Sequence, residues 1–450
     1  MSERDELLAA AAEVSAESGA ALLERPLGEY DDPAVVLADL LAGTGPDGVV
    51  VAVTNDADAS ALVSLLRSDP LQAADATRGR PVGQATAFKL LLEAGFSPDL
   101  VRVVPSDLGD MDLTALLAAA APLWEQQRID KERAARQLSA GGYVFLCRPI
   151  EDVAEDRAVP LAGQRPVTFV ACINDDLQLG SNLLASPALA PGGPHQLLTY
   201  RGMSSAAEGL NKGLSAAEHE LVVFIQQDIY VPSWWPARLV RQWELADGVS
   251  GGDGPPWLAG AFGLRYREGG REHVGHVVDR DSLLREQRAL PARVDGLDEL
   301  VLVVPRDTSL RVEPSLGWHL YGTDLALQVH RAEGWTAVLD LPCHHNSLYH
   351  RLDESYRHSE AVLATRWPRE LPIYTNTSTI SEDPRDARMR ALVADLEKGH
   401  RDFADRGAAL LGAESEVARL NEQVVRLNDQ VGKMRGRIRR LRGRDDEGGA

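Results

Sequence analysis

The chain has 450 residues, a hydrophobic fraction of 44% and a formal net charge of −20 at pH 7. This length fits two or three domains, and the apolar content is ordinary for a globular protein. The acidic balance argues against nucleic acid as the main partner, because duplex binding requires a basic face.

Three cysteines without metal-binding spacing are present, namely Cys147, Cys172 and Cys343. Such a sparse, odd-numbered set indicates reduced thiols. The N-terminus has mixed charge and does not look like a signal peptide, and the sequence has no run of about 18 apolar residues that would span a membrane. We therefore expect a cytoplasmic protein.

Helix and strand patterns alternate up to about residue 150. They predict helices at 33–43, 85–96 and 113–138, and strands at 49–56, 100–106 and 141–150. Strands separated by helices indicate an α/β layer, a partial Rossmann-like module at 1–150. The polar, proline-containing stretch at 151–165 is predicted to be a linker.

The strings DPAVVLADLLAGTGPDGVVVAVTND, ATAFKLLLEAGF and GGYVFLCRP in this module resemble the C-terminal half of a class I methyltransferase. In that family the methyl donor lies on an N-terminal glycine-rich loop, and too little chain precedes Asp32 to hold one. The resemblance therefore implies a degenerate module that binds no S-adenosylmethionine, with Asn55 and Asp56 as turn residues. A working methyltransferase would need its donor half from another chain.

The second region begins with a predicted strand at 167–175 that ends on Asn174 and Asp175. A later apolar strand at 221–225 leads to Gln226, Gln227 and Asp228, shortly before Pro232. Open α/β sheets bind ligands at the carboxyl ends of their strands. A carboxylate there suits a divalent cation that neutralises a diphosphate, although an isolated Asp at a strand end is more often a turn former.

This stretch resembles the family-2 glycosyltransferases, which implies a GT-A nucleotide-sugar-binding fold at 166–375. Asp228 matches the last acid of the family's metal-binding Asp-any-Asp motif, and the neutral Gln226 stands in place of the first. Asn211 lies in the family's upstream asparagine-glycine helix. The resemblance implies nucleotide contacts for Asn174 and Asp175, and it places Asn211 and Gln226 beside them. The alternative interpretation is that Asn174 and Asp175 only terminate the strand.

The resemblance continues downstream and covers about 210 residues. Asp324 matches the catalytic base at a helix start, and His345, or its neighbour His344, matches the histidine of the metal site. A base is needed to take the proton of the acceptor hydroxyl, and positive charge is needed at the departing diphosphate. The alternative for Asp324 is a helix-capping role. His276 is interpreted as a surface or packing histidine.

The C-terminal segment at 385–445 shows a heptad pattern, with apolar residues in alternating steps of three and four from Leu410 to Leu441. Mostly β-branched residues at one heptad core position and mostly leucine at the other favour a parallel coiled-coil dimer over a helix packed on its own body. Gly432 and Gly436 weaken the helix locally. Basic residues crowd the end of the segment, which predicts either a solvated face or a contact with an anionic surface at the inner membrane face.

The sequence thus predicts a glycosyltransferase of cell-surface polysaccharide synthesis. It would take a nucleoside-diphosphate sugar, a divalent metal (Mn2+ or Mg2+) and a glycan or glycolipid acceptor, and it would dimerise through its coiled coil. The alternative is an inactive GT-A-like scaffold or glycan-binding protein, because Gln226 replaces an acid and the methyl-donor loop is missing. The convergence of Asp228, Asp324 and His345 on one cleft distinguishes the two hypotheses.

Overall fold

The computed structural model describes residues 3–30, 32–54, 83–105, 135–137, 139–249, 254–268, 270–285, 289–347 and 354–381. The chain divides into two compact units, of which the first comprises Met1–Asp107 and Arg128–Ala387. The second comprises residues 108–127 and 388–450, and it lies outside the described residues. The predicted coiled coil, its basic end and the turn residues Asn55 and Asp56 therefore lie outside the described residues, as does nearly all of the helix expected at 113–138. Among the described residues, no helix is long and apolar enough to cross a membrane.

The N-terminal layer of the first unit is a four-stranded sheet with helices on both faces. Its strands are ordered β1-β2-β4-β3, with β1 and β2 parallel and β4 antiparallel to both of its neighbours. The elements are α1 (Glu3–Ser18), β1 (Ala21–Leu22), α2 (Pro33–Gly43), β2 (Val49–Thr54), α4 (Gln84–Ala94), β3 (Phe96–Pro105) and β4 (Ala140–Pro149). These bounds confirm the predicted helices at 33–43 and 85–96 and the strands near 49, 100 and 141, with β3 starting four residues early.

The stretch predicted as a linker contains the short helix α7 (Val153–Arg157). Val153 and Asp156 on this helix are buried, and Asp156 forms ion pairs with Arg238 and Arg241. The stretch was predicted to be a linker because it is polar and contains prolines. The burial arises from long-range pairing that the composition does not reveal.

The central sheet has seven strands in the order β13-β16-β9-β15-β7-β5-β6. Strands β5, β6 and β7 are parallel, β9 and β16 run in the same direction, and β15 and β13 are antiparallel to their neighbours. The strands are β5 (Thr168–Ile173), β6 (Gln196–Arg201), β7 (Leu221–Ile225), β9 (Leu258–Gly260), β13 (Ala292–Val294), β15 (Val301–Pro305) and β16 (Thr336–Val338). This mixed sheet confirms the α/β class expected from the sequence.

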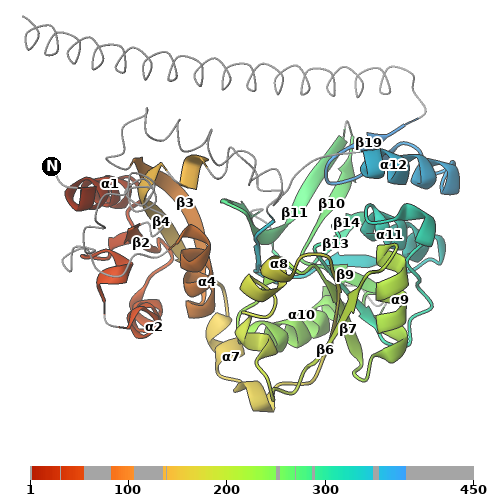
Figure 1. The fold of residues 1–450 in the computed structure, drawn as a ribbon, viewed down its shortest axis with the longest axis horizontal. Helices are drawn as coiled ribbons and strands as arrows, with labels where there is room; N and C mark the ends of the chain where they lie inside the picture. Colours follow the sequence, from red (N-terminus) through yellow and green to blue (C-terminus); the bar gives the residue numbers. More distant parts are fainter. Residues whose placement is uncertain are drawn as a thin grey trace, which may run out of the picture. The chain divides into compact units, whose positions relative to one another are not determined.

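Both faces of the central sheet are buried, because successive residues of its apolar strands alternate between two cores. Val223 and Ile225 pack toward α10 (Trp235–Val249), whereas Val222 and Phe224 pack toward α9 (Ala206–Ala216) and α11 (Tyr321–Arg331). Figure 1 shows α9 and α10 on opposite sides of the strands. The remaining helices of this part are α8 (Asp176–Ser181) and α12 (Glu354–Arg366).

A second sheet lies beside the carboxyl edge of the central one, in the order β14-β10-β11-β17-β8, with β12 paired to β11. Its strands are β8 (Ile229–Tyr230), β10 (Phe262–Arg267), β11 (Gly270–Asp279), β12 (Ser282–Arg285), β14 (Gly296–Leu297) and β17 (His344–His345), and a separate hairpin pairs β18 (Ile373–Tyr374) with β19 (Thr379–Ile380). Because β8 follows β7 after three residues, this sheet begins where the central strand ends.

Candidate functional site

Polar side chains gather at the carboxyl edge of the central sheet. Asn174 and Asp175 follow β5, and Gln226, Gln227 and Asp228 follow the neighbouring parallel strand β7. The antiparallel strand β15 starts at the same edge, and Asp298 and Glu299 precede it. Residues that are about 125 positions apart in the sequence therefore share one edge, which is the position where open α/β sheets bind ligands.

Gln227 fixes the turn after β5. Its Oε1 accepts hydrogen bonds from the backbone N–H groups of Asn174 and Asp175, at 2.9 and 3.1 Å, and its Nε2 donates to Asn174 Oδ1. Asp175 caps α8, since its Oδ1 accepts from the N–H groups of Leu177 and Gln178 at 2.9 and 3.0 Å. Asn174 and Asp175 thus follow the last residue of β5, and Asn174 is exposed at the edge, while their contact with a nucleotide stays a prediction.

His345 lies between two carboxylates. Its Nδ1 is 2.8 Å from Asp279 Oδ1, and its Nε2 is 3.7 Å from Asp228 Oδ1. The strand register brings these residues together, because His345 in β17 pairs with Asp279 on one side and with Ile229, next to Asp228, on the other. The structure therefore brings together the two residues that the resemblance named as metal ligands.

The carboxylates around His345 outweigh the effect of its burial. Burial alone would lower the pKa of His345, but Asp228, Asp279 and Asp298 raise it to about 9. The imidazole is therefore protonated at neutral pH when no cation is bound. A carboxylate that holds the Nδ1 proton of a histidine and leaves Nε2 directed at another ligand is a usual arrangement behind a metal site.

Asp298 and Glu299 form a carboxyl pair at the start of β15. Burial raises the pKa of Asp298, against the opposing effects of the Leu300 amide, at 3.0 Å, and of His345. Burial, followed by the charge of Asp298, raises the pKa of Glu299 to about 8. The buried Oε1 of Glu299 has no hydrogen-bond partner. A carboxyl group with a pKa near neutrality at a ligand-binding edge is suited to proton transfer.

Gln226, which replaces the first acid of the motif, faces α11 and β15. Its backbone N–H donates to the carbonyl of Leu300 at 3.1 Å, and its side chain hydrogen bonds the hydroxyl of Tyr321. The same hydroxyl donates to the Glu299 carbonyl at 3.3 Å. Gln226 thus joins Tyr321 to the carboxyl edge without adding a charge there.

Asp324 lies in the first turn of α11 and is fully buried. Its Oδ1 accepts from Trp367 Nε1 at 2.7 Å and pairs with Arg366 Nε at 2.9 Å, while its Oδ2 accepts from Gln328 Nε2 at 2.7 Å. The N-cap position belongs to Leu320, so Asp324 is not the helix cap either. Two of these donors lie at the end of α12 and the third, Gln328, lies on α11 itself, so the carboxylate is occupied by neighbouring side chains. The role of Asp324 as a base stays a prediction.

Asn211 lies on α9 and uses its amide in a two-way contact with one backbone position. Its Nδ2 donates to the carbonyl of Val312 at 2.9 Å, and its Oδ1 accepts from the Val312 N–H at 3.0 Å. This pairing ties α9 to the segment before α11. It gives Asn211 a structural role, and the predicted contact with the nucleotide has no support from this geometry.

The donor atoms at the edge fit a divalent cation bound by two protein ligands. Asp228 Oδ1 is buried and has no hydrogen-bond partner, and it faces His345 Nε2. No group of three or more potential ligands occurs in the described part of the chain. Mg2+ sites commonly combine one or two carboxylates with substrate phosphates, so two protein donors are compatible with a cation that a diphosphate completes.

Three residues of the cluster received no role from the sequence, namely Asp279, Asp298 and Glu299. Asp279 ends a strand that pairs with β17, and neither its own motif nor its spacing indicates that pairing. Asp298 and Glu299 precede an apolar strand that the sequence pattern indicates. The start of that strand lies at the carboxyl edge only because the strand is antiparallel to β7, which the sequence does not reveal.

No family model matches the chain. A curated protein of Fuscovulum blasticum, described as ATP synthase subunits region ORF 6, is 28% identical over 161 residues, which are 34% of this chain and 61% of that protein. Among solved structures, GalNAc-T7 with UDP, GalNAc and Mn2+ is similar with 10% identity and a TM-score of 0.31, over 54% of this chain and 53% of that chain. The chain thus spans less than two thirds of either protein, and neither likeness assigns it to a family.

Proposed function

We propose that residues 166–375 transfer a sugar from a nucleoside-diphosphate sugar to a hydroxyl group of a glycan or glycolipid. The observation that supports this best is the approach of Asp228 to His345 at the carboxyl edge, where β5 and β7 also end. Sequence resemblance to family-2 glycosyltransferases had singled out the same two residues. Their strands are separated by more than 110 residues, so their approach is independent of the local motif.

Asp228 and His345 would hold the cation, Mn2+ or Mg2+, through Oδ1 and Nε2. Such a cation would offset the negative charge of the departing diphosphate. Asp279 holds Nδ1 of His345 at 2.8 Å and so orients the imidazole. Asn174, exposed at the end of β5, would contact the nucleotide, and Gln227 fixes the turn that presents it.

We further propose that the Asp298–Glu299 pair takes the proton of the acceptor hydroxyl. Glu299 is partly exposed and has a pKa near 8, and although backbone groups of Leu320 and Gly322 hydrogen bond its carboxyl group, its Oε1 has no partner. Asp324, by contrast, is fully buried and is held by Trp367 and Arg366. A base must reach the proton that it removes. Glu299→Gln should therefore reduce the rate of transfer more than Asp324→Asn does, when both are compared at equal folded fraction.

The other predicted properties stay proposals. The N-terminal layer would be a degenerate methyltransferase-like module, and the heptad segment would make the protein a dimer at cytoplasmic sites of glycan assembly. Light scattering tests the dimer directly, since a monomer would contradict it. These proposals rest on sequence pattern, and the transfer reaction does not depend on them.

A thermal-shift screen with nucleoside diphosphates and nucleotide sugars, with and without Mn2+, tests the proposed function. A ligand that binds only the folded state stabilises it by about 2.7 kcal/mol at a hundredfold excess over its Kd. We expect a Mn2+-dependent shift with one nucleotide series, which Asp228→Asn and His345→Gln abolish. Asp176→Asn is the matched control, because Asp176 is an exposed acid in the helix capped by Asp175 and pairs with Arg201.

The outcomes separate the two hypotheses that the sequence left open. A shift that survives both cluster substitutions would show nucleotide binding elsewhere. The absence of any shift with any nucleotide would reject the transferase and favour the scaffold, which binds no donor.

A further inference from the structure

The residues that surround His345 lie on three neighbouring strands of the second sheet. Strand β8 follows Asp228, β17 contains His345, and β11 ends at Asp279. Strands β8 and β17 have two residues each, with the register Tyr230–His344 and Ile229–His345. Such short strands make few ladder hydrogen bonds, so their placement depends on what packs against them.

Helix α4 of the N-terminal layer packs against these strands. The ring of Phe88 lies 5.1 Å from the ring of His344, between centroids, and Lys89 Nζ lies 5.6 Å from the centroid of Tyr230. Phe88 is fully buried, in one apolar cluster with Val277 and Val278 of β11. The core of the N-terminal layer therefore continues into the strands that hold the metal-ligand candidates.

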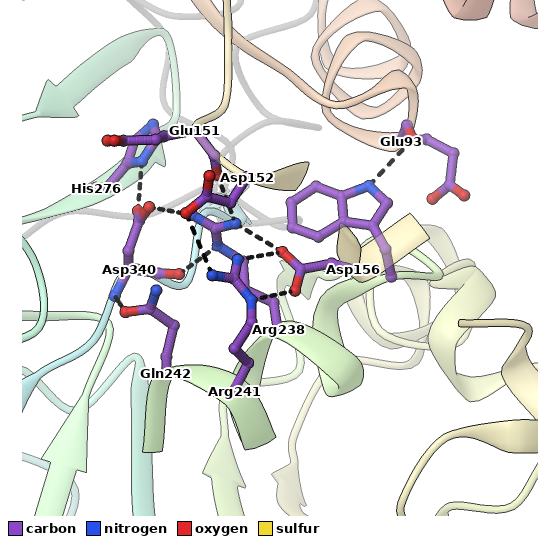
Figure 2. A network of polar contacts seen from close by, with 10 residues as sticks. Glu93, Glu151, Asp152, Asp156, Arg238, Arg241, Gln242, His276 and Asp340 are labelled. Atoms are coloured by element: carbon purple, nitrogen blue, oxygen red, sulfur yellow. Dashed lines mark hydrogen bonds and ion pairs between the residues drawn. The ribbon is translucent and has the colours of Figure 1, made fainter. Parts of the chain in front are cut away.

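The last turn of α4 contacts the loop that follows Asp228 and β8. Glu93 Oε2 accepts from the backbone N–H of Ser233 at 2.9 Å, and the Glu93 carbonyl accepts from Trp234 Nε1 at 3.1 Å. Figure 2 shows this indole bond to Glu93. The loop is thereby attached to α4 at both a side chain and the backbone.

A buried polar chain fixes β11 as well. Ser97 Oγ, at the start of β3, is 2.8 Å from His276 Nε2, and His276 Nδ1 is 2.7 Å from Asp340 Oδ1. Asp340 pairs with Arg238, which also contacts Asp156 of α7 at 2.7 Å (Figure 2). His276 lies three residues before Asp279 on the same strand.

The Ser97–His276–Asp340 arrangement has the connectivity of a serine-hydrolase triad, but its burial gives it a different role. Ser97 is 1% exposed and His276 is 3% exposed, so a substrate has no access to the hydroxyl. A nucleophile must reach the reacting carbonyl. The chain of hydrogen bonds therefore holds β11 against β3.

We propose that the N-terminal layer positions the Asp228–Asp279–His345 cluster, with Phe88 and Ser97 as its positioning residues. The ring contact of Phe88 with His344 fixes the position of β17. The hydrogen bond between Ser97 and His276 fixes the position of β11. The consequence for cation and donor binding rests on the proposed function. The positioning of β11 and β17 by the N-terminal layer does not depend on the proposed function.

Hydrogen–deuterium exchange on the whole chain tests the positioning without any ligand. Phe88→Leu keeps an apolar side chain but removes the ring, and Ser97→Ala removes one hydrogen bond. The control is Leu7→Ala, because Leu7 is buried in the same layer but on the face of α1, away from α4.

We expect both test variants to accelerate exchange about 2- to 10-fold at the N–H groups of Val278 and Arg280, which bond to Cys343 and His345. Leu7→Ala should accelerate exchange only around α1 and β2. If Phe88→Leu and Ser97→Ala leave residues 276–280 and 343–346 as protected as in the wild type, the positioning role is wrong.

Mn2+ and UDP titrations of the same variants then address the consequence. Failure of the wild-type protein to bind either probe would reject the proposed function and leave the exchange result intact. Weaker Mn2+ binding by Ser97→Ala and Phe88→Leu, at unchanged affinity in Leu7→Ala, is the expected result. Equal Mn2+ affinity in all three would remove the positioning role toward the cation.

Discussion

Removing the carboxylate of Asp156 should destabilise the protein strongly, because two arginines depend on it. Asp156 is 2% exposed, and its oxygens lie 2.7 Å from Arg238 Nη1 and 2.8 Å from Arg241 Nε. Arg238 is itself 1% exposed. Asp156→Ala leaves a buried guanidinium with fewer acceptors and removes the bidentate partner of Arg241.

The size of the effect follows from this burial. Removing one partner of a buried ion pair costs about 3–5 kcal/mol, and Asp340 still pairs with Arg238, so we expect about 3 kcal/mol. The exposed pair of Glu13 and Arg102, with side chains 64% and 36% exposed, gives the comparison. Glu13→Ala should cost about 0.2–1 kcal/mol, because solvent screens such pairs.

Thermal unfolding followed by tryptophan fluorescence measures both variants. With an unfolding entropy of about 2.1 cal/mol/K per residue, a loss of about 3 kcal/mol corresponds to a fall of roughly 4 °C in the midpoint of the first unit, which has about 370 residues. On the same scale, Glu13→Ala should lower the midpoint by about 1 °C or less. If Asp156→Ala shifts the midpoint no more than Glu13→Ala does, the network in Figure 2 contributes little and the reasoning from burial is refuted.

Three further predictions concern pH. Burial alone would raise the pKa of Asp340, but His276 and Arg238 outweigh this effect and lower the pKa to about 2. The free energy of unfolding, measured in urea, should therefore decrease as the pH falls from about 4 to 2. This decrease should be smaller in Asp340→Asn. Burial and the charge of Asp298 raise the pKa of Glu299 to about 8, so the contribution of Glu299 to the free energy of unfolding is lost as the pH rises. Glu299→Gln should therefore be as stable as the wild type near pH 4 and more stable at pH 9. Equal stability of the two proteins at every pH would contradict the assigned pKa. Since carboxylates raise the pKa of His345 to about 9 despite its burial, a cation must displace a proton there; calorimetric Mn2+ affinity should fall about tenfold per pH unit from 9 to 7, whereas a flat profile would exclude His345 as a ligand.

Local sequence signals were sufficient to predict the helices and strands, but not which strands pair in the sheets. The apolar runs Val49–Thr54 and Leu221–Ile225 form strands because both faces of each are buried, and Pro33 after the capping Asp32 starts α2 as its conformation favours. The direction and neighbours of each strand depend on contacts far along the chain. The sequence therefore predicted the α/β class without the strand order.

The candidate site was predictable to the same degree. Asp228 follows a recognisable apolar strand, but it was the resemblance to family-2 glycosyltransferases that singled out both Asp228 and His345 as metal ligands. The structure places Asp228 Oδ1 3.7 Å from His345 Nε2. Asp279 could not be singled out, because its relation to His345 exists only in the register of β11 with β17. The burial of Asp324 against Trp367 depends on the packing of α12, which the helix-start pattern does not encode.

The apolar cluster that joins the N-terminal layer to the second sheet also constrains which sequences can share this fold. Phe88 and Leu92 of α4 belong to the same apolar cluster of buried residues as Val277 and Cys343. In such a core, a larger side chain on one side is tolerated only with a smaller one opposite. Among relatives of this chain, the side-chain volumes of residues on α4 should therefore co-vary with those of residues on β11 and near β17. The sequences of the N-terminal layer and of the second sheet would then not change independently of each other.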